Sequence, residues 1–170
     1  MTNKQFMAWL KKHGVCSGAM EWIGKRTPKR AWDECQRGAW MLWALVRADY
    51  SNQKTLRLFM VWNARQRLAK VENPDPRSLA ACDVAERFAN GEATDWELKT
   101  AYSSAYIAAD AADAAFAYAD AAYAAADAAA AADAAATYAV AGYLGSAAAD
   151  KLREIIPWNE IEPLIKEITV

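Results

Sequence analysis

The sequence predicts an all-α fold in which several short N-terminal helices pack on long alanine-rich helices. Helix-capping signals recur in the N-terminal part, and 28 of the 50 residues from 101 to 150 are alanine. No segment alternates polar and apolar residues for long enough to form a sheet. The chain has 170 residues, 55% of them apolar, so it is near the size of one domain and can bury a core.

The first two expected helices lie at the start of the chain. Residues 2–5 match a capping box with Thr2 as the cap, and the helix that follows ends at Gly14. Ser17 is expected to cap a second, short helix that Gly24 closes.

Three helices are expected next. Thr27 and Pro28 start a helix that runs toward Gly38, because threonine is a good cap and proline is favoured at the first helical position. The apolar residues 39–48 form another helix, and residue 51 or 52 opens a long amphipathic helix to about residue 71.

Two further helices follow a clear break. Residues 73–76, Asn-Pro-Asp-Pro, interrupt the chain, a helix covers residues 77–89, and Asn90 and Gly91 stop it. Residues 94–97 form a second capping box, which opens the alanine tract.

The alanine tract has no Gly or Pro between Thr100 and Ala141, which predicts one uninterrupted helix. Such a helix would be about 60 Å long, whereas a compact domain of this size has a radius of gyration of about 15 Å. Either the tract folds back, or the protein is elongated or oligomeric. Asp113, Asp120 and Asp127 repeat every seven residues on a Tyr/Asp face, and the opposite face is mostly alanine. We expect self-association through that alanine face.

Charge divides this single domain into three segments. Residues 1–93 form a basic Trp-rich part that carries 16 Lys and Arg against 9 Asp and Glu, a net charge of +7. The alanine-rich tract, residues 94–150, has a net charge of −7, and the C-terminal helical cap, residues 151–170, has a net charge of −1. Either the segments neutralise each other, or the basic one attracts an anion. The total of −1 excludes a globally basic binder of double-stranded nucleic acid and a globally acidic DNA mimic. Charged residues interrupt the longest apolar runs and no signal-peptide pattern is present, so we expect a cytoplasmic protein without a membrane span.

Catalytic and metal-binding motifs are lacking in the sequence. Cys16, Cys35 and Cys82 are widely spaced and His13 is the only histidine, so neither a disulfide framework nor a zinc site is expected. We predict no catalytic residue, no metal ligand and no cofactor, and expect the protein not to be an enzyme.

A cluster of Trp and Arg residues is the best candidate for a ligand-binding site. Indole faces with nearby guanidinium groups can stack a base and hold a phosphate. The candidate ligand-binding residues are Trp32, Arg37, Trp40, Trp43, Arg47, Arg57 and Arg65. The alternative is that the tryptophans belong to the core and the arginines cap helix ends or pair with the aspartates of the tract.

The same cluster carries a resemblance to a known family. The pattern Ala-Trp-x-x-Cys-x-Arg-Gly-x-Trp-Met-Leu-Trp over residues 31–43, with Ile-Ile-Pro-Trp at 155–158, is similar to small alanine-rich immunity proteins of bacteria and their viruses. Ala39 departs from that pattern, where similar sequences have Asp. The resemblance implies a part in conflict between microbes or between virus and host, but supplies no target and no active site.

Three functions are compatible with these observations. The first is a non-enzymatic protein that sequesters or neutralises a ligand, either an anionic small molecule such as a nucleotide signal or a protein partner such as a defence or toxin component. The second is a small hydrolase using paired carboxylates, either Asp33 with Glu34 or Asp110 with Asp113. The third is a purely structural oligomerisation module.

Overall fold

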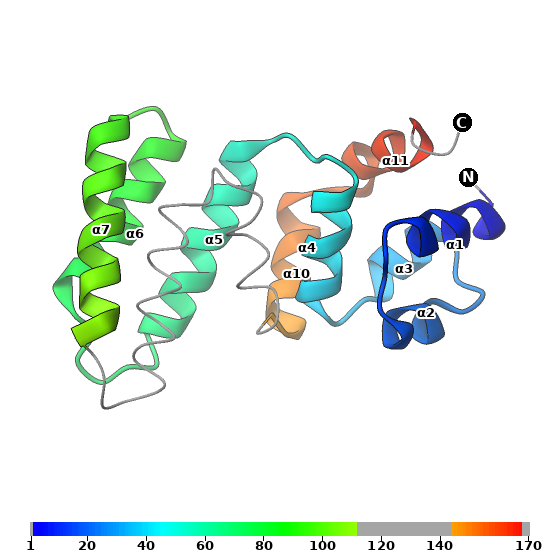
Figure 1. Ribbon diagram of the computed structural model, residues 1–170, viewed down its shortest axis with the longest axis horizontal. Helices are drawn as coiled ribbons and strands as arrows, with labels where there is room; N and C mark the ends of the chain where they lie inside the picture. Colours follow the sequence, from blue (N-terminus) through cyan, green and yellow to red (C-terminus); the bar gives the residue numbers. More distant parts are fainter. Residues whose placement is uncertain (1, 112–143, 168–170) are drawn as a thin grey trace. The chain divides into compact units, whose positions relative to one another are not determined.

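The fold is described from a computed structural model, for residues 2–111 and 144–167 (Figure 1). Every regular element in these residues is an α-helix and none is a strand, which confirms the predicted fold class for this part of the chain. None of these helices is long and apolar enough to cross a membrane. The chain divides into two compact units, one of Met1–Ser51 with Ala141–Val170 and the other of Asn52–Val140. The second unit is therefore an insertion in the sequence of the first.

The described helices of each unit follow the chain in order. In the first unit they are α1 (Asn3–Lys12), α2 (Ser17–Ile23), α3 (Pro28–Glu34), α4 (Gly38–Arg47), α10 (Ser146–Ile155) and α11 (Trp158–Glu167). In the second unit they are α5 (Gln53–Leu68), α6 (Pro76–Ala89) and α7 (Asp95–Ala111).

Side-chain caps start several helices as predicted. The Thr2 hydroxyl accepts a hydrogen bond from the Gln5 N–H at 3.3 Å, and the Gln5 side chain accepts one from the Thr2 N–H at 2.9 Å. Thr94 and Glu97 repeat this capping box at the start of α7, with distances of 3.2 and 2.7 Å. The Thr27 hydroxyl accepts from a backbone N–H of α3 at 3.2 Å. These contacts confirm three of the predicted helix starts.

The second unit begins and turns where the sequence predicts. The Asn52 side chain accepts from the Thr55 N–H at 3.1 Å, so Asn52 and not Ser51 caps α5. Asp75 caps α6, and Gly91 follows that helix with a φ of 78°, in the left-handed region that glycine favours.

Two helix boundaries differ from the prediction. Ser17 is the first residue of α2, and its N-cap is Cys16, which makes no side-chain capping hydrogen bond. The expected continuation of α3 toward Gly38 is also wrong, because the helix ends at Glu34. Cys35 takes an extended conformation there, with φ −64° and ψ 126°.

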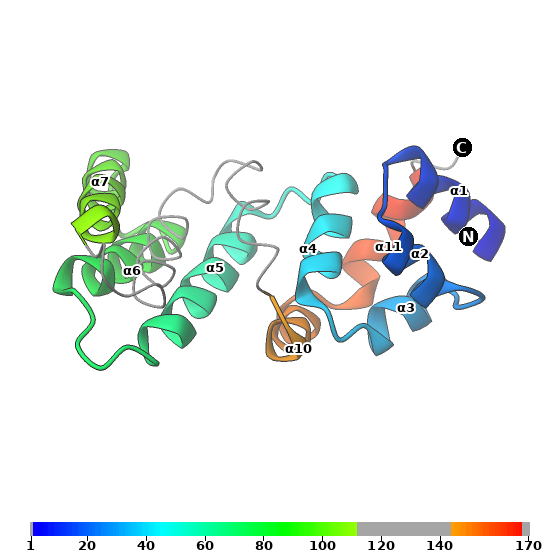
Figure 2. The ribbon, with the colours of Figure 1, turned by 60° about the horizontal axis from the view of Figure 1, so that its bottom comes forward.

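Helices α4 and α10 lie side by side in the first unit and approach closely (Figures 1 and 2). A Cβ on Gly38 would lie 2.8 Å from the Cβ of Ala148 and 3.1 Å from the Ala149 nitrogen, so only glycine fits without a shift. Leu42 of α4 and Leu152 of α10 are among the fully buried side chains. This pair of helices joins segments far apart in the sequence into one core.

The start of α4 is also paired with the chain that precedes α10. The Gly38 N–H donates to the Gly145 carbonyl and the Ala39 N–H donates to the Leu144 carbonyl, each at 3.3 Å. Both N–H groups are therefore already satisfied within the unit, and α4 is fixed in position at the end that bears Arg37.

In the second unit, α7 packs on α6 through small residues. Ala81 of α6 and Ala105 of α7 are fully buried, and Ala101 packs against them. Tyr102 and Tyr106 lie on another side of α7 and are exposed, with ring centroids 6.1 Å apart. The rest of the tract, residues 112–143, lies outside the described residues, so the long uninterrupted helix and self-association through its alanine face stay predictions.

Candidate functional site

Two indoles and two guanidinium groups of the first unit contact one another in series, and we call this group the Trp–Arg ladder. Trp22 of α2 and Trp40 of α4 have ring centroids 5.9 Å apart at an interplanar angle of 52°. The guanidinium of Arg26 lies 4.6 Å from the Trp22 centroid, and that of Arg37 lies 4.5 Å from the Trp40 centroid. The order is therefore guanidinium, indole, indole, guanidinium, and each contact has cation–π or aromatic-pair geometry.

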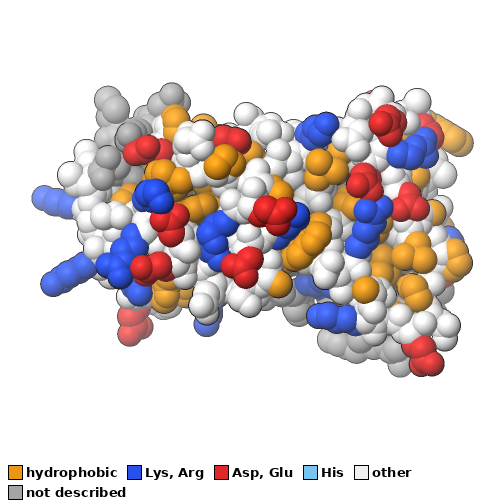
Figure 3. Space-filling model, turned by 180° about the vertical axis from the view of Figure 1, so that it is seen from behind, with side chains coloured by type: hydrophobic (Ala, Val, Ile, Leu, Met, Phe, Trp, Pro, Cys, Tyr) orange, Lys and Arg blue, Asp and Glu red, His pale blue; other side chains and the backbone are white. Residues whose placement is uncertain are grey.

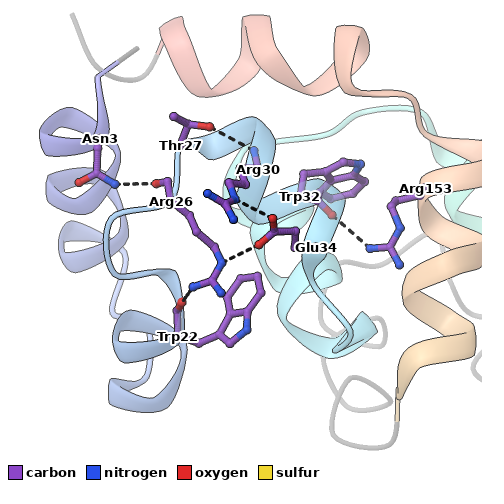
Figure 4. A network of polar contacts seen from close by, with 8 residues as sticks. All are labelled: Asn3, Trp22, Arg26, Thr27, Arg30, Trp32, Glu34 and Arg153. Atoms are coloured by element: carbon purple, nitrogen blue, oxygen red, sulfur yellow. Dashed lines mark hydrogen bonds and ion pairs between the residues drawn. The ribbon is translucent and has the colours of Figure 1, made fainter.

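One end of the ladder is closed by a carboxylate (Figure 4). Arg26 Nε donates to Glu34 Oε2 at 2.9 Å, and its Nη1 donates to the Trp22 carbonyl. Arg30 Nε donates to the other oxygen of Glu34 at 2.6 Å. These hydrogen bonds, from Arg30 first and then from Arg26, lower the pKa of Glu34. The charge at this end is balanced within the unit.

The other end of the ladder is open. Arg37 is exposed, and its guanidinium forms no ion pair with any carboxylate of the residues that the structure describes. Its backbone is fixed, since its carbonyl accepts from the N–H of Trp40 at 3.0 Å and from the Cys35 thiol at 3.4 Å. The ladder therefore presents one oriented guanidinium to solvent.

Arg153 of α10 fixes the segment that leads to Arg37. Its Nη1 donates to the carbonyl oxygen of Trp32 at 3.1 Å (Figure 4) and to that of Cys35 at 2.6 Å. Its Nη2 donates to Asp150 at 2.5 Å. These two carbonyls lie at the C-terminal end of α3, where no further helical turn satisfies them. Arg153 thus takes the place of a helix C-cap and positions residues 35–37.

The other residues of the first unit that were predicted from the sequence lie in the core, against another ring or at a helix end. Trp32 is buried in the core, with 7% of its surface exposed. Trp43 packs edge-on against Trp9 at a centroid distance of 6.0 Å. Arg47 is the last residue of α4 and is exposed. Among the candidates in this unit, the structure brings Arg37 and Trp40 into direct contact.

Arg57 and Arg65 belong to the second unit and are engaged there. Arg57 is only 2% exposed, and its guanidinium lies 4.8 Å from the Phe88 ring centroid. Burial lowers the pKa of Arg57, and the nearby Asp95 opposes this shift. Arg65 Nη2 lies 2.9 Å from Asp83 and 2.6 Å from Glu86. Both side chains hold α5 to its neighbours, which leaves Arg37 as the better-placed candidate.

Trp22 and Arg26 were not among the residues predicted from the sequence. Their i,i+4 spacing is a signal for contact on a helix, but Gly24 ends α2 between them, so the helical rule does not apply. The contact of Trp22 with Trp40 spans two helices, and no local pattern in the sequence indicates it.

Charged side chains of both signs are interspersed on the face drawn in Figure 3. Ion pairs form within each unit, including the one between Lys29 and Asp33 at 2.5 Å and the one between Arg87 and Glu97 at 2.7 Å. Glu97 accepts a backbone hydrogen bond from Thr94 and a side-chain hydrogen bond from Arg87, which together lower its pKa to about 2. Local pairing therefore neutralises several of the basic residues that give the N-terminal segment its net charge.

Both carboxylates of the adjacent pair, at residues 33 and 34, are engaged in ion pairs. Asp33 is bound by Lys29, and the pKa of Glu34 is lowered, whereas a general acid needs a raised one. The side chain of Asp110 and all of Asp113 lie outside the described part of the chain. Within the described ranges, no group of three or more His, Cys, Asp or Glu could hold a metal ion.

Comparisons of this chain with protein-family models, curated proteins and solved structures find no match. The resemblance to alanine-rich immunity proteins therefore stays a prediction.

Proposed function

We propose that this protein is a non-enzymatic binding protein that captures a phosphate-bearing ligand, in the first place a nucleotide, at the open end of the Trp–Arg ladder. The observation that carries the proposal is the Arg37 guanidinium, which is exposed and lies 4.5 Å from the Trp40 centroid. Arg37 forms no ion pair with the carboxylates of the described residues, whereas Arg65 is paired with Asp83 and Glu86.

Stacking prepares the guanidinium for an anion. An arginine held over an indole has lost part of its rotational freedom before the ligand arrives, so less entropy is lost on binding. The planar group offers N–H donors in a fork that matches two oxygens of a phosphate. A charge-assisted contact of this kind contributes about 1.5–3 kcal/mol, which corresponds to roughly 10- to 150-fold in affinity.

The biological role that fits such a site is sequestration. The carboxylate pair at residues 33 and 34 is engaged in ion pairs, which supports a protein that holds its ligand without converting it. The resemblance to immunity proteins favours a ligand used in conflict between microbes or between virus and host. We place this activity in the cytoplasm, where nucleotide signals are made. An acidic surface of a protein partner is the alternative ligand, because Trp and Arg are also typical of protein-interface hot spots.

Self-association belongs to the same proposal and rests on the sequence of the tract. Replacing Ala115, Ala122 and Ala129 with Glu would place charges on its alanine face, so we expect smaller particles in size exclusion with light scattering. A wild-type protein that is strictly monomeric at micromolar concentration would contradict this part.

The binding test is calorimetry of mono-, di- and cyclic nucleotides with the wild type, Arg37→Ala and the control Lys25→Ala. Lys25 is exposed and belongs to the same unit, so its replacement removes one positive charge without removing a residue of the ladder. We expect Arg37→Ala to lose at least tenfold in affinity with a nearly unchanged Tm, and Lys25→Ala to bind as the wild type.

Three outcomes would contradict the proposal. If no nucleotide binds the wild type, or if Arg37→Ala binds as well as the wild type, the ladder is not the capture site. If Arg37→Ala instead lowers the Tm by several degrees and no ligand is found, the guanidinium pairs internally with acidic residues of the chain.

A further inference from the structure

We infer that the ladder recognises the phosphate group alone and does not distinguish the base attached to it. This inference rests on the proposed function and specifies its ligand class as phosphate monoesters in general. The sequence alone also allows an indole to stack the base while an arginine holds the phosphate, whereas here the indole supports the arginine.

Each indole of the ladder already has a guanidinium over one face. Arg37 lies over Trp40, and Arg26 lies over Trp22, at 4.5 and 4.6 Å from the ring centroids. The two indoles are 5.9 Å apart and tilted by 52°. A base inserted between two rings needs about 3.5 Å on each side, or roughly 7 Å between parallel planes. The space between Trp22 and Trp40 therefore does not admit a base.

Uncovering either indole has a cost that works against binding. Arg26 is held by hydrogen bonds to Glu34 and to the Trp22 carbonyl, so removing it from Trp22 breaks both. Moving Arg37 away from Trp40 removes the support that orients the group expected to hold the phosphate. A base stacked on the face of Trp40 that Arg37 covers and a phosphate held by the supported guanidinium thus exclude each other.

The remaining donors at this place favour an oxyanion. The first backbone N–H groups of α4, at Gly38 and Ala39, donate to the carbonyls of Gly145 and Leu144 and are not offered to a ligand. The N–H groups of Arg37 lie in the plane of its guanidinium, so acceptor atoms of a ligand approach along the edge of this group. Two phosphate oxygens match that edge, whereas the base, carried on the far side of the ribose, adds no required contact.

The test compares ligands that share a phosphate and differ in the rest, by calorimetry with the full-length protein. The ligands are adenosine 5′-monophosphate, uridine 5′-monophosphate, ribose 5-phosphate, inorganic phosphate and adenosine. We expect the three phosphate esters to bind with Kd values within about threefold of one another and adenosine not to bind. Inorganic phosphate distinguishes a site for the free ion from one for esters: equal binding assigns the site to phosphate in any form, and weaker binding assigns it to esters.

Variants of Trp40 separate support of the guanidinium from stacking of a base. Trp40→Leu removes the aromatic face, so the affinity for every phosphate ester should fall by the same factor. Trp40→Phe keeps an aromatic face and should retain most of the wild-type affinity. If Trp40→Leu does not fold, Trp40→Phe still allows the affinities for the different esters to be compared, because it preserves a ring.

Base dependence would overturn this inference and leave the proposed function standing. Adenosine binding, or a tenfold preference for adenosine 5′-monophosphate over ribose 5-phosphate, would show that the base is read, for example by stacking on the outer face of the Arg37 guanidinium. Absence of binding by every phosphate would overturn the proposed function itself and this inference with it.

Discussion

The close approach of α4 and α10 predicts that Gly38→Ala destabilises the first unit. The new Cβ would lie 2.8 Å from the Ala148 Cβ and 3.1 Å from the Ala149 nitrogen, whereas carbon atoms in ordinary contact are about 3.5–4.0 Å apart. Overpacking of this kind costs about 1–3 kcal/mol, and the higher helix propensity of alanine offsets at most about 1 kcal/mol. We expect a net loss of about 1–2 kcal/mol, equivalent to a fall in Tm of roughly 2–8 °C for a chain of this size.

Urea unfolding followed by tryptophan fluorescence suits this measurement, because six of the eight tryptophans belong to the first unit. Gly18→Ala in α2 is the matched control. Its Cβ would lie 3.9 Å from the Trp40 ring, an ordinary contact, so the same substitution should stabilise the protein by about 0.5–1 kcal/mol. The two glycine variants are thus expected to shift the midpoint in opposite directions.

A double variant tests whether the clash with α10 is the cause. Ala148→Gly removes the Cβ that lies nearest to residue 38, so it should cost less in the Gly38→Ala background than in the wild type. If Gly38→Ala is as stable as the wild type, or if the two changes are additive, the inferred close approach of the two helices is incorrect.

Three further predictions concern side chains described above. Arg153→Ala should lower the free energy of unfolding by about 1–3 kcal/mol in urea titrations, because two carbonyls at the end of α3 lose their donor. Arg153→Lys should recover only part of this loss, since lysine lacks the planar fork. Glu97 has a pKa of about 2 in the folded protein against an ordinary 4.5, so the stability it contributes is fully present above pH 4.5 and is lost as the pH falls toward 2. The difference in unfolding free energy between wild type and Glu97→Gln should shrink over that range; a constant difference would contradict the assignment. Native protein treated with a thiol reagent should be modified at Cys16 alone, as counted by mass spectrometry, because Cys35 and Cys82 are buried and burial raises their pKa values, that of Cys82 to about 11.

Helix starts were the most predictable part of the fold, because their determinants are neighbours in the sequence. The capping boxes at Thr2 and Thr94 each need partners only three residues away, and the structure contains both. The end of α3 was not predictable in this way. It depends on Arg153, which lies 118 residues beyond Cys35 in the chain and satisfies its carbonyl.

The candidate site was predictable in part for the same reason. Arg37 is the N-cap of α4 and Trp40 lies in the first turn of that helix, so the two side chains that touch are close neighbours in the sequence. Trp22 joins them only because α2 packs near α4, where Gly18 lies beside the Trp40 ring. Burial of Arg57 under Phe88 likewise depends on packing between helices, and the sequence pattern of basic residues does not distinguish it from the exposed Arg37.

The inserted position of the second unit has a consequence for synthesis on the ribosome. At about 5–20 residues per second, translation reaches Arg153 roughly 6–24 s after Cys35. During that interval the end of α3 has no donor for its carbonyls, and Gly38 has no α10 to pack against. The second unit, Asn52–Val140, is continuous in the chain and emerges completely before α10 does. The N-terminal segment therefore completes its packing only after the C-terminal helices have been synthesised.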